Sequence, residues 1–233
     1  DNNEILVLAS YKKLKDLNVI YDYFKDNSYD QNLSKLIKMH VQDFELEEKY
    51  KAKIKSLDKI KNKTSLDVRF QYESFPYPRW DDDSLETYKM LNYASRINKD
   101  VYPNKIEDSK IESVLIAGCG TGYQAIVSAV TDPSVIVHAL DLSKSSLSYG
   151  KRKADEYGVE NITWLHGDIM NLNSSEQKYD LIECCGVLHH MEDPEKAFKI
   201  LTSKLNDKGF FKLALYAKKY RETLSFEKSL IKR

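Results

Sequence analysis

The feature that most restricts the fold is a short apolar run that leads directly into three glycines at alternate positions. Residues 114–117 are Val-Leu-Ile-Ala, and Gly118, Gly120 and Gly122 follow them. A continuous apolar run without alternation is typical of a strand buried on both faces of a parallel sheet. Glycine tolerates positive φ and lets a ligand approach the backbone where a Cβ would block it. The stretch therefore predicts a strand, a tight turn and a helix, with a ligand at the carboxyl end of the strand.

Further apolar runs at regular intervals predict the rest of an α/β domain. Strands are predicted at 112–117, 134–140, 161–166, 179–184 and 209–216, and helices at 121–130, 143–157 and 193–205. Gly158 and Gly209 fit the C-cap of a helix and the turn into a strand. Strands that alternate with helices in this way favour a Rossmann-like, doubly wound and mostly parallel sheet.

The spacing of the glycines separates two classes of cofactor. A dinucleotide-binding turn has glycine at the first, third and sixth places, but here the sixth place is Tyr123 and the extra glycine is Gly122. An NAD-linked oxidoreductase is therefore disfavoured. The predicted second strand ends at Asp141, and an acid there can accept hydrogen bonds from both hydroxyls of a ribose. Because Ser143 and Ser145 follow, an ordinary helix N-cap is the alternative for Asp141.

Four landmarks in the same order resemble the class I methyltransferases that use S-adenosylmethionine (SAM). They are the Gly-x-Gly-x-Gly turn, Asp141, the run Gly167-Asp168-Ile169, and Gly186-Val187-Leu188-His189-His190-Met191 after the fourth strand. The resemblance implies a SAM-dependent methyltransferase that releases S-adenosylhomocysteine (SAH) and uses no metal. It implies that Asp168 meets the adenine amino group and that Ile169 lies against the ring. The cofactor-binding residues that it implies are Gly118, Cys119, Gly120, Gly122, Asp141, Leu142, Asp168, Ile169 and Cys185.

A second informative stretch, residues 68–80, is dense in aromatic side chains and contains Pro76 and Pro78. Proline is excluded from helix interiors and biases the residue before it to an extended backbone. Residues 71–80 are similar to a Gln-Tyr-Glu-Glu-Asn-Pro-Tyr-Pro-Arg-Trp segment that precedes the SAM-binding core in a bacterial methyltransferase family. Ser74 and Phe75 replace the Glu-Asn pair of that segment. The family is often linked to tetratricopeptide repeats, and the similarity covers roughly residues 66–220.

This aromatic segment favours a lid over the cofactor. Arg79 would pair with the carboxylate of SAM or of an acidic substrate, because a guanidinium can bind both carboxylate oxygens. Tyr72, Tyr77 and Trp80 would wall the pocket and exclude water, and one phenol would orient the methyl acceptor. A packed linker with no part in binding is the alternative interpretation.

Methyl transfer from a sulfonium is a displacement at an activated carbon, so the protein has mainly to hold the cofactor and aim the nucleophile. His189 and His190 both follow the fourth strand and carry side chains that titrate near neutral pH, and the resemblance to the family favours His190 as the candidate general base. A histidine that only holds its loop is the alternative. Cys184 and Cys185 lack the proline that precedes the nucleophile of cytosine carbon-5 enzymes, and both are interpreted as small buried residues. The acceptor is predicted to be a small molecule or a protein side chain.

The N-terminal residues 1–65 are predicted to be helical. Apolar stripes run through residues 14–24 and 33–44, and a densely charged stretch occupies residues 45–63. Residues 66–233 are assigned to the SAM-binding domain, with a short helix within 81–110 and a charged helix at the end. The C-terminal strand hairpin of the family is expected to lie beyond residue 233.

Composition narrows the partners and the compartment. Lys plus Arg and Asp plus Glu both number 36, so the formal net charge is zero and the basic bias of a nucleic-acid-binding protein is missing. Three cysteines favour a cytoplasmic protein without a disulfide framework, and no apolar run long enough for a membrane span is visible. The N-terminal helices could dock a protein partner. A catalytically weak SAM-binding scaffold or sensor that docks through them is the alternative function.

Overall fold

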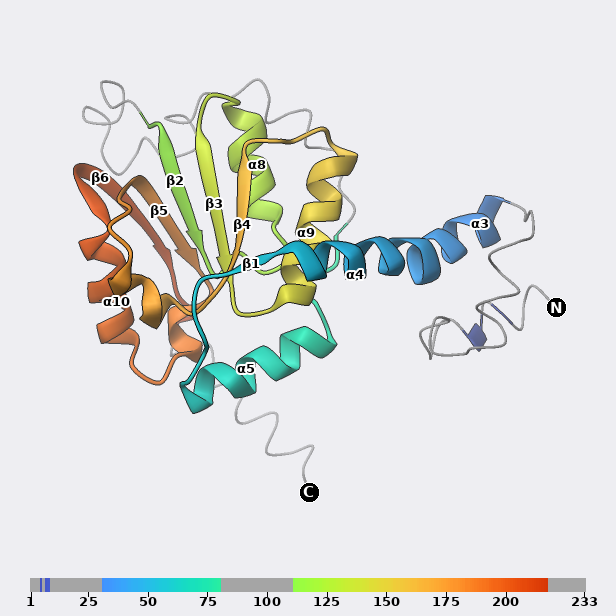
Figure 1. Cartoon of the computed structure of the whole chain (residues 1–233), viewed down its shortest axis with the longest axis horizontal. Coiled ribbons are helices and arrows are strands. Elements are labelled where there is room, and N and C mark those ends of the chain that lie inside the picture. Colours follow the sequence, from blue (N-terminus) through green and yellow to red (C-terminus); the bar gives the residue numbers. More distant parts are fainter. Residues whose placement is uncertain (1–4, 6, 9–30, 81–110, 218–233) are drawn as a thin grey trace. The chain divides into compact units, whose positions relative to one another are not determined.

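The computed structural model describes residues 5, 7, 8, 31–80 and 111–217 (Figure 1). The chain divides into two compact units, Asp1–Lys53 and Ile54–Arg233. The sequence prediction sets its boundary after residue 65, whereas the second compact unit begins at Ile54. The helices predicted within residues 14–24 and 81–110 and at the C-terminus lie outside the described residues.

The described part of the first unit is helical. It comprises α3 (Gln31–Ile37), the π-helical turn η2 (Lys38–Gln42) and α4 (Asp43–Lys53). Leu33, Ile37 and Val41 recur at every fourth position and are at most 3% exposed, so they form the buried stripe that the sequence predicts. The prediction of helix through residue 65 is wrong for residues 54–62, where the chain is extended or irregular.

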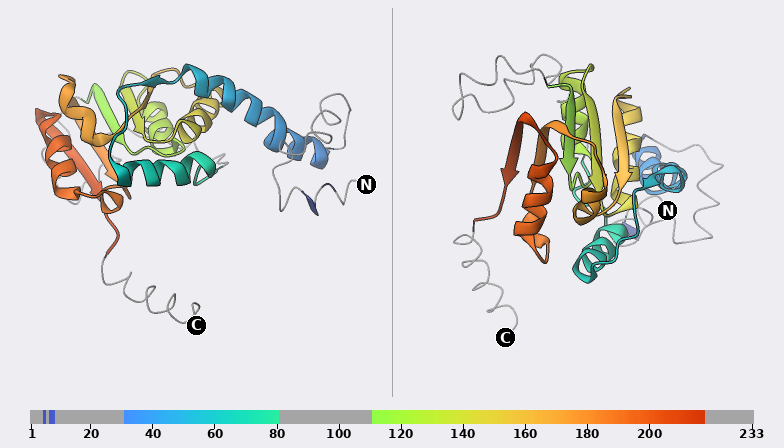
Figure 2. Two further views of the ribbon diagram at one scale, coloured as in Figure 1. Left: turned by 60° about the horizontal axis from the view of Figure 1, so that its bottom comes forward. Right: turned by 60° about the vertical axis from the view of Figure 1, so that its left-hand side comes forward.

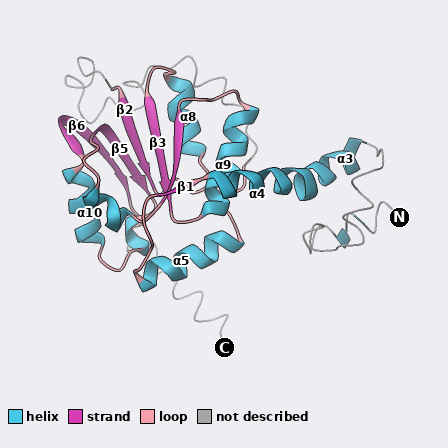
Figure 3. Cartoon of the chain, viewed as in Figure 1, coloured by secondary structure: helices cyan, strands magenta, loops and turns pink. Residues whose placement is uncertain are grey.

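The second unit is built on a sheet of six strands that all run parallel (Figure 3). The sheet order is β1-β4-β3-β2-β5-β6. The strands are β1 (Lys55–Ser56), β2 (Ser113–Ala117), β3 (Ile136–Asp141), β4 (Ile162–His166), β5 (Tyr179–Cys185) and β6 (Leu205–Ala214). The predicted parallel α/β sheet is confirmed, although β6 begins earlier than predicted. β1 escapes prediction because its two exposed residues carry no apolar pattern, and only their pairing with Leu165 and His166 makes them a strand.

Helices cover both faces of this sheet (Figures 1 and 2). The helices that contribute to the two cores are α8 (Tyr123–Thr131), α9 (Lys144–Glu156) and α10 (Pro194–Ser203). Along β2, Val114 and Ile116 join the apolar core that contains residues of α8 and α9, whereas Leu115 and Ala117 join the core that contains residues of α10. Alternate residues of a strand point to opposite faces, so an unbroken apolar strand fills both cores.

The strand order fixes where a ligand can bind. From β2 the chain continues to β3 and β4 on one side, and then returns to β5 and β6 on the other side. A reversal of this kind leaves a crevice outside the carboxyl ends of the central strands. The turn after β2 is held at this place, because the amides of Gly118 and Cys119 both donate to the carbonyl oxygen of Leu140, over 2.8 and 3.0 Å.

A further helix, α5 (Lys63–Ser74), lies near these carboxyl ends (Figures 1 and 2). The side chain of Asn62 caps it by accepting a hydrogen bond from the Ser65 amide. It ends before Phe75, whose φ of −137° and ψ of 80° lie outside the helical region that proline disfavours for the residue before it. The first half of the aromatic segment 68–80 thus belongs to a helix, and both prolines come only after that helix has ended.

A substitution in α9 tests how tightly this core is packed. Gly150 has a helical backbone, so alanine should gain about 1 kcal/mol of helix propensity. A Cβ on Gly150 would, however, lie 2.6 Å from Cζ3 of Trp164, and overpacking of this kind costs about 1–3 kcal/mol. We expect Gly150→Ala to lower the free energy of unfolding, measured by urea denaturation. In a Trp164→Leu background the same substitution should lose most of its cost, and an equal cost in both backgrounds would contradict the packing argument.

Candidate functional site

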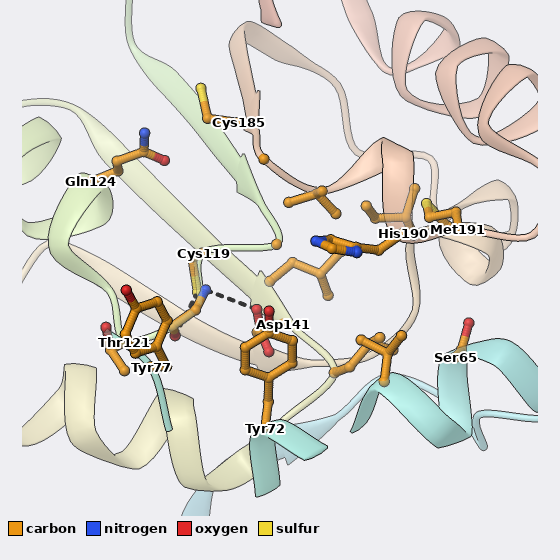
Figure 4. Close-up of a pocket in the computed structure, with 18 of the residues that line it drawn as sticks. Ser65, Tyr72, Tyr77, Cys119, Thr121, Gln124, Asp141, Cys185, His190 and Met191 are labelled. Atoms are coloured by element: carbon orange, nitrogen blue, oxygen red, sulfur yellow. Dashed lines mark hydrogen bonds between the residues drawn. The ribbon is translucent and has the colours of Figure 1, made fainter. Parts of the chain in front are cut away.

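A cavity of about 400 Å3 opens at the carboxyl ends of the central strands (Figure 4). Turns that follow four strands form much of its wall, and α5 and the segment after it add to that wall. The turns contribute residues 118–121, 140–142, 167–169 and 185–187. Segments that are far apart in the sequence therefore meet at one cavity, as expected of an open parallel sheet.

Two glycines of the turn after β2 are required by packing within the protein. Gly118 and Gly122 have φ of +74° and +84°, which side chains other than glycine rarely adopt. A Cβ on Gly118 would lie 2.4 Å from Cγ2 of Val187, and a Cβ on Gly122 would lie 2.6 Å from Cη2 of Trp164. These two positions shape the turn and leave no room for a side chain.

Gly120 differs from its neighbours because open space lies beside it. Its φ is +53°, but a Cβ would approach only the carbonyl oxygen of Tyr77, at 3.6 Å. Among the described residues, therefore, no atom would clash with a side chain at position 120, while Gly120 itself lines the cavity. A bare backbone facing a cavity allows a ligand to lie against the turn.

The Asp141 carboxylate joins the ends of β2 and β3. Its Oδ2 atom accepts a hydrogen bond from the Gly120 amide over 2.8 Å (Figure 4). Its Oδ1 atom accepts one from the Ser143 amide over 2.9 Å. Burial raises the pKa of this carboxyl, the amides of Ser143, Gly120 and Leu142 act in the opposite direction, and Glu73 raises the pKa further. Asp141 lines the cavity, and Ser143, not Asp141, is the N-cap of α9.

Three other residues predicted to bind the cofactor, Leu142, Asp168 and Ile169, also line the cavity. Asp168 is 3% exposed, and its side chain caps the 3-10 turn η3 (Ile169–Ser174) by accepting from the Met170 amide. Ile169 and Leu142 lie beside the two acidic residues on the cavity wall. Hydrogen-bond capacity is left on Asp168, because a carboxylate has about four acceptor positions.

The burial of the cysteines agrees only in part with the sequence interpretation. Cys119 and Cys184 are buried, and burial raises the pKa of Cys119 well above its usual range and that of Cys184 to about 12. Cys185 is only half-buried and lines the cavity together with Cys119. The interpretation of Cys185 as a fully buried residue is therefore wrong, since it ends β5 at the cavity itself.

The predicted lid residues fall into two groups. Tyr72, from α5, and Tyr77 line the cavity. The pKa of Tyr72 is raised first by burial and then by Asp141, Tyr216 and Tyr77, all three of which also line the cavity. Arg79 and Trp80 are not among the residues that line it, in contrast to the sequence hypothesis that they meet the cofactor.

Trp80 instead packs on α9. Its amide donates to the hydroxyl of Tyr149 over 2.9 Å, that hydroxyl donates back to the Trp80 carbonyl, and the rings of Trp80 and Tyr157 stack with centroids 6.1 Å apart. The guanidinium of Arg79 lies 4.8 Å from the centroid of the Tyr149 ring. These aromatic contacts account for Arg79 and Trp80 without a ligand.

The same segment is tied to the glycine turn. The Thr121 hydroxyl donates to the Pro78 carbonyl over 2.5 Å, and the indole nitrogen of Trp80 donates to the Thr121 carbonyl over 3.3 Å. The Tyr77–Pro78 peptide bond is cis. Pro78 and Trp80 therefore hold the loop after α5 against the turn, with Tyr77 at the cavity.

His190 lies at the cavity from the other side (Figure 4). It ends the 3-10 turn η4 (Leu188–His190), and its amide donates to the Val187 carbonyl over 2.9 Å. Its ring centroid is 4.2 Å from that of His189, which lies 4.3 Å from that of Tyr216. The ring of His190 is a titratable group that reaches the cavity from the turn after β5.

Several cavity residues are not found by sequence reasoning. Ser65 and Val68 lie on the same face of α5 as the predicted Tyr72, with the spacing of three and four residues that a helical face requires. This spacing can be recognised in the sequence once residues 63–74 are known to form a helix. Tyr216 lies just beyond β6, where the carboxyl-end rule places ligand contacts, but no motif identifies it.

The described residues contain neither a cluster suited to a metal ion nor a helix suited to cross a membrane. Within residues 31–80 and 111–217 together with residues 5, 7 and 8, no three His, Cys, Asp or Glu side chains are grouped as a metal site would require. Over the same described residues, no helix has both the length and the apolar character needed to cross a membrane.

Comparison with known proteins connects this arrangement to a family. Residues 114–209 match the family model described as a methyltransferase domain. An uncharacterized protein of Synechococcus is 33% identical over 105 residues, which are 45% of this chain and 25% of the relative. A ubiquinone biosynthesis O-methyltransferase of Coxiella burnetii is 32% identical over 90 residues, 39% of this chain and 37% of the enzyme.

A solved structure with local similarity is PKMT2 from Rickettsia typhi in complex with S-adenosylhomocysteine. It is 30% identical, with a TM-score of 0.41 over 44% of this chain and 20% of that one. The chain spans only part of the length of the first curated relatives that it matches. It covers 25% of the Synechococcus protein and 55% and 24% of two uncharacterized proteins of Rickettsia prowazekii.

The glycines of the turn should differ in their effect on stability. Alanine at Gly118 or Gly122 combines positive φ with a clash, so we expect each to lower the free energy of unfolding by more than about 2 kcal/mol. Alanine at Gly120 should cost only about 1 kcal/mol of backbone strain. Gly158→Ala is a matched control, since Gly158 has φ +66° and nothing within 4 Å of a Cβ. Equal losses at all four positions in urea denaturation would show that the contacts do not matter.

Proposed function

We infer that this chain, whose residues 114–209 match a methyltransferase domain, is a SAM-dependent methyltransferase that binds SAM in the cavity and methylates a small molecule or a protein side chain. The observation that carries the proposal is the open side of Gly120 beside the Asp141 carboxylate. A backbone without a side chain next to a partly buried acid suits a nucleoside, because the acid can accept hydrogen bonds from ribose hydroxyls.

The residues present fit the cofactor. Gly120 provides the close approach at the turn, Asp141 is the candidate for the ribose hydroxyls, and Asp168 with Ile169 is the candidate for the adenine. These residues follow successive strands, so their order along the sheet edge can match the order of groups in an extended nucleoside. Bound SAM would supply a methyl group on a sulfonium, which is already activated for displacement.

The chain has three tasks in such a reaction. The turn and the two acids hold and orient the cofactor, so that the reacting atoms meet in one geometry. Tyr72 and Tyr77 wall the cavity and exclude water from it. A ring nitrogen of His190 takes the proton of the acceptor where that acceptor must lose one. The buried thiols of Cys119 and Cys184 are poor nucleophiles, because burial raises the pKa of both.

The identity of the acceptor rests on weaker support. Tyr77 and Tyr216 line the cavity and are 71% and 61% exposed, so rings are available to pack against an acceptor that enters from solvent. The named function of the Coxiella relative, an O-methyltransferase of ubiquinone biosynthesis, supports a small molecule. We therefore propose a small-molecule acceptor first and a protein side chain second.

The proposal predicts selective binding that depends on the open side of Gly120. In isothermal titration calorimetry, the protein should bind SAM and SAH but not NAD. Gly120→Ala should weaken SAH binding at least tenfold, because a methyl group would occupy the side of the turn that faces the cavity. Gly158→Ala should leave SAH affinity within twofold, since its Cβ meets nothing and it does not line the cavity. Tight NAD binding, or equal effects of the two alanines, would refute the assignment of the turn.

The proposed role of Asp141 in binding the ribose can be separated from its role in holding the turn. Asp141→Ala should weaken SAH binding at least tenfold, because charge-assisted hydrogen bonds to the ribose are lost. The same substitution also removes the acceptor of the Gly120 amide, so a second ligand is needed. An SAH analogue without its two ribose hydroxyls should bind the parent protein and Asp141→Ala about equally. If Asp141→Ala weakens both ligands to the same extent, Asp141 only holds the turn.

A further inference from the structure

The Tyr-Glu pair of the aromatic segment contains a residue that the proposed function does not use. Tyr72 lines the cavity, whereas Glu73 points to the N-terminus of α9. The Oε2 atom of Glu73 accepts a hydrogen bond from the Ser143 hydroxyl over 2.9 Å and one from the Ser145 amide over 3.2 Å. Helix N-termini favour a negative charge, and hydrogen bonds to an ionised carboxylate are stronger than neutral ones.

The turn that Glu73 contacts also carries the acid of the cavity. Residues 141–146 lead from β3 into α9. Within them, the Ser143 amide donates to Asp141 over 2.9 Å, and the Ser143 hydroxyl oxygen accepts from the Ser146 amide over 3.0 Å as the cap of α9. One serine thus touches Asp141 through its amide and Glu73 through its hydroxyl. A shift of Glu73 would therefore displace Ser143 and, through its amide, the hydrogen bond to Asp141.

The far end of α5 is held at a separate place. The side-chain amide of Asn62 donates to the Glu192 carboxylate over 2.5 Å, next to the turn after β5. Between the two ends, α5 presents Ser65, Val68 and Tyr72 to the cavity (Figure 4). The helix therefore bridges the cavity from the β5 side to the β3 side, and Glu73 makes its contact on the β3 side.

We propose that Glu73 is a positioning residue that fixes α5, and with it Tyr72, over the cofactor end of the cavity. The contact also transmits the state of the 141–146 turn to α5, so that a ligand held at Asp141 and the helix that encloses it stabilise one another. The second statement rests on the proposed function, whereas the first depends only on the contacts of Glu73.

Hydrogen exchange tests the positioning role without any ligand. Glu73→Gln keeps the size of the side chain and removes its charge, and Glu73→Ala removes the contact. Glu176→Gln is the matched control, because Glu176 is exposed and does not line the cavity. Amides of residues 66–74 should exchange at least fivefold faster in both Glu73 variants, with α10 unchanged. If exchange in α5 stays at the parent rate in Glu73→Ala while the protein is folded, the proposal is overturned.

Dissociation of SAH tests the coupling. Stopped-flow measurements should show SAH leaving Glu73→Ala at least fivefold faster than the parent, with Glu73→Gln between them and Glu176→Gln unchanged. A residue that only stabilises the fold would lower the melting temperature and leave this rate unchanged in the folded protein, and that outcome overturns the coupling. Failure of the parent protein to bind SAH would refute the proposed function and the coupling, while the exchange experiment would still decide the positioning role of Glu73.

Discussion

The hydrogen bond from the Gly120 amide to the Asp141 carboxylate is the interaction on which the site depends. It joins the turn after β2 to the end of β3, and the amides of Gly118 and Cys119 reinforce it by donating to Leu140. The turn is thus shaped by the neighbouring strand and does not need a ligand to form. Each Asp141 oxygen keeps acceptor capacity in addition to its backbone partner, so holding the turn and binding hydroxyls are compatible tasks.

The parts of the structure that could be predicted are those specified by local sequence. Val114 to Ala117 fill two cores because nothing polar interrupts them. The end of α9 can be recognised from Gly158, which follows the C-cap Tyr157 and has a φ of +66°. The candidate cavity residues after β2, β3 and β4 follow from the same logic, since parallel strands bring their carboxyl ends together. Their presence at one cavity is a matter of topology, and their individual roles remain proposals.

Other features depend on contacts between distant residues, which sequence patterns do not encode. Lys55 and Ser56 become a strand only by pairing with β4, more than 100 residues later. The aromatic composition and the prolines of the segment around Trp80 suggest a pocket residue. In the structure, however, the amide and the carbonyl of Trp80 both bond to the hydroxyl of Tyr149, 69 positions away. The aromatic segment therefore contains three structural parts, a helix with a cavity face, a loop with Tyr77 at the cavity, and an anchor on α9.

The position of the two tryptophans has an experimental consequence. The chain contains only Trp80 and Trp164. Trp80 donates to the carbonyl of Thr121, and Trp164 packs so closely against Gly122 that no side chain could stand there. Both indoles thus touch the same turn, one through a hydrogen bond and one through ring contact. The intrinsic emission of the unmodified protein is accordingly an optical probe of that turn, and single Trp→Phe replacements would divide the signal between its two sides.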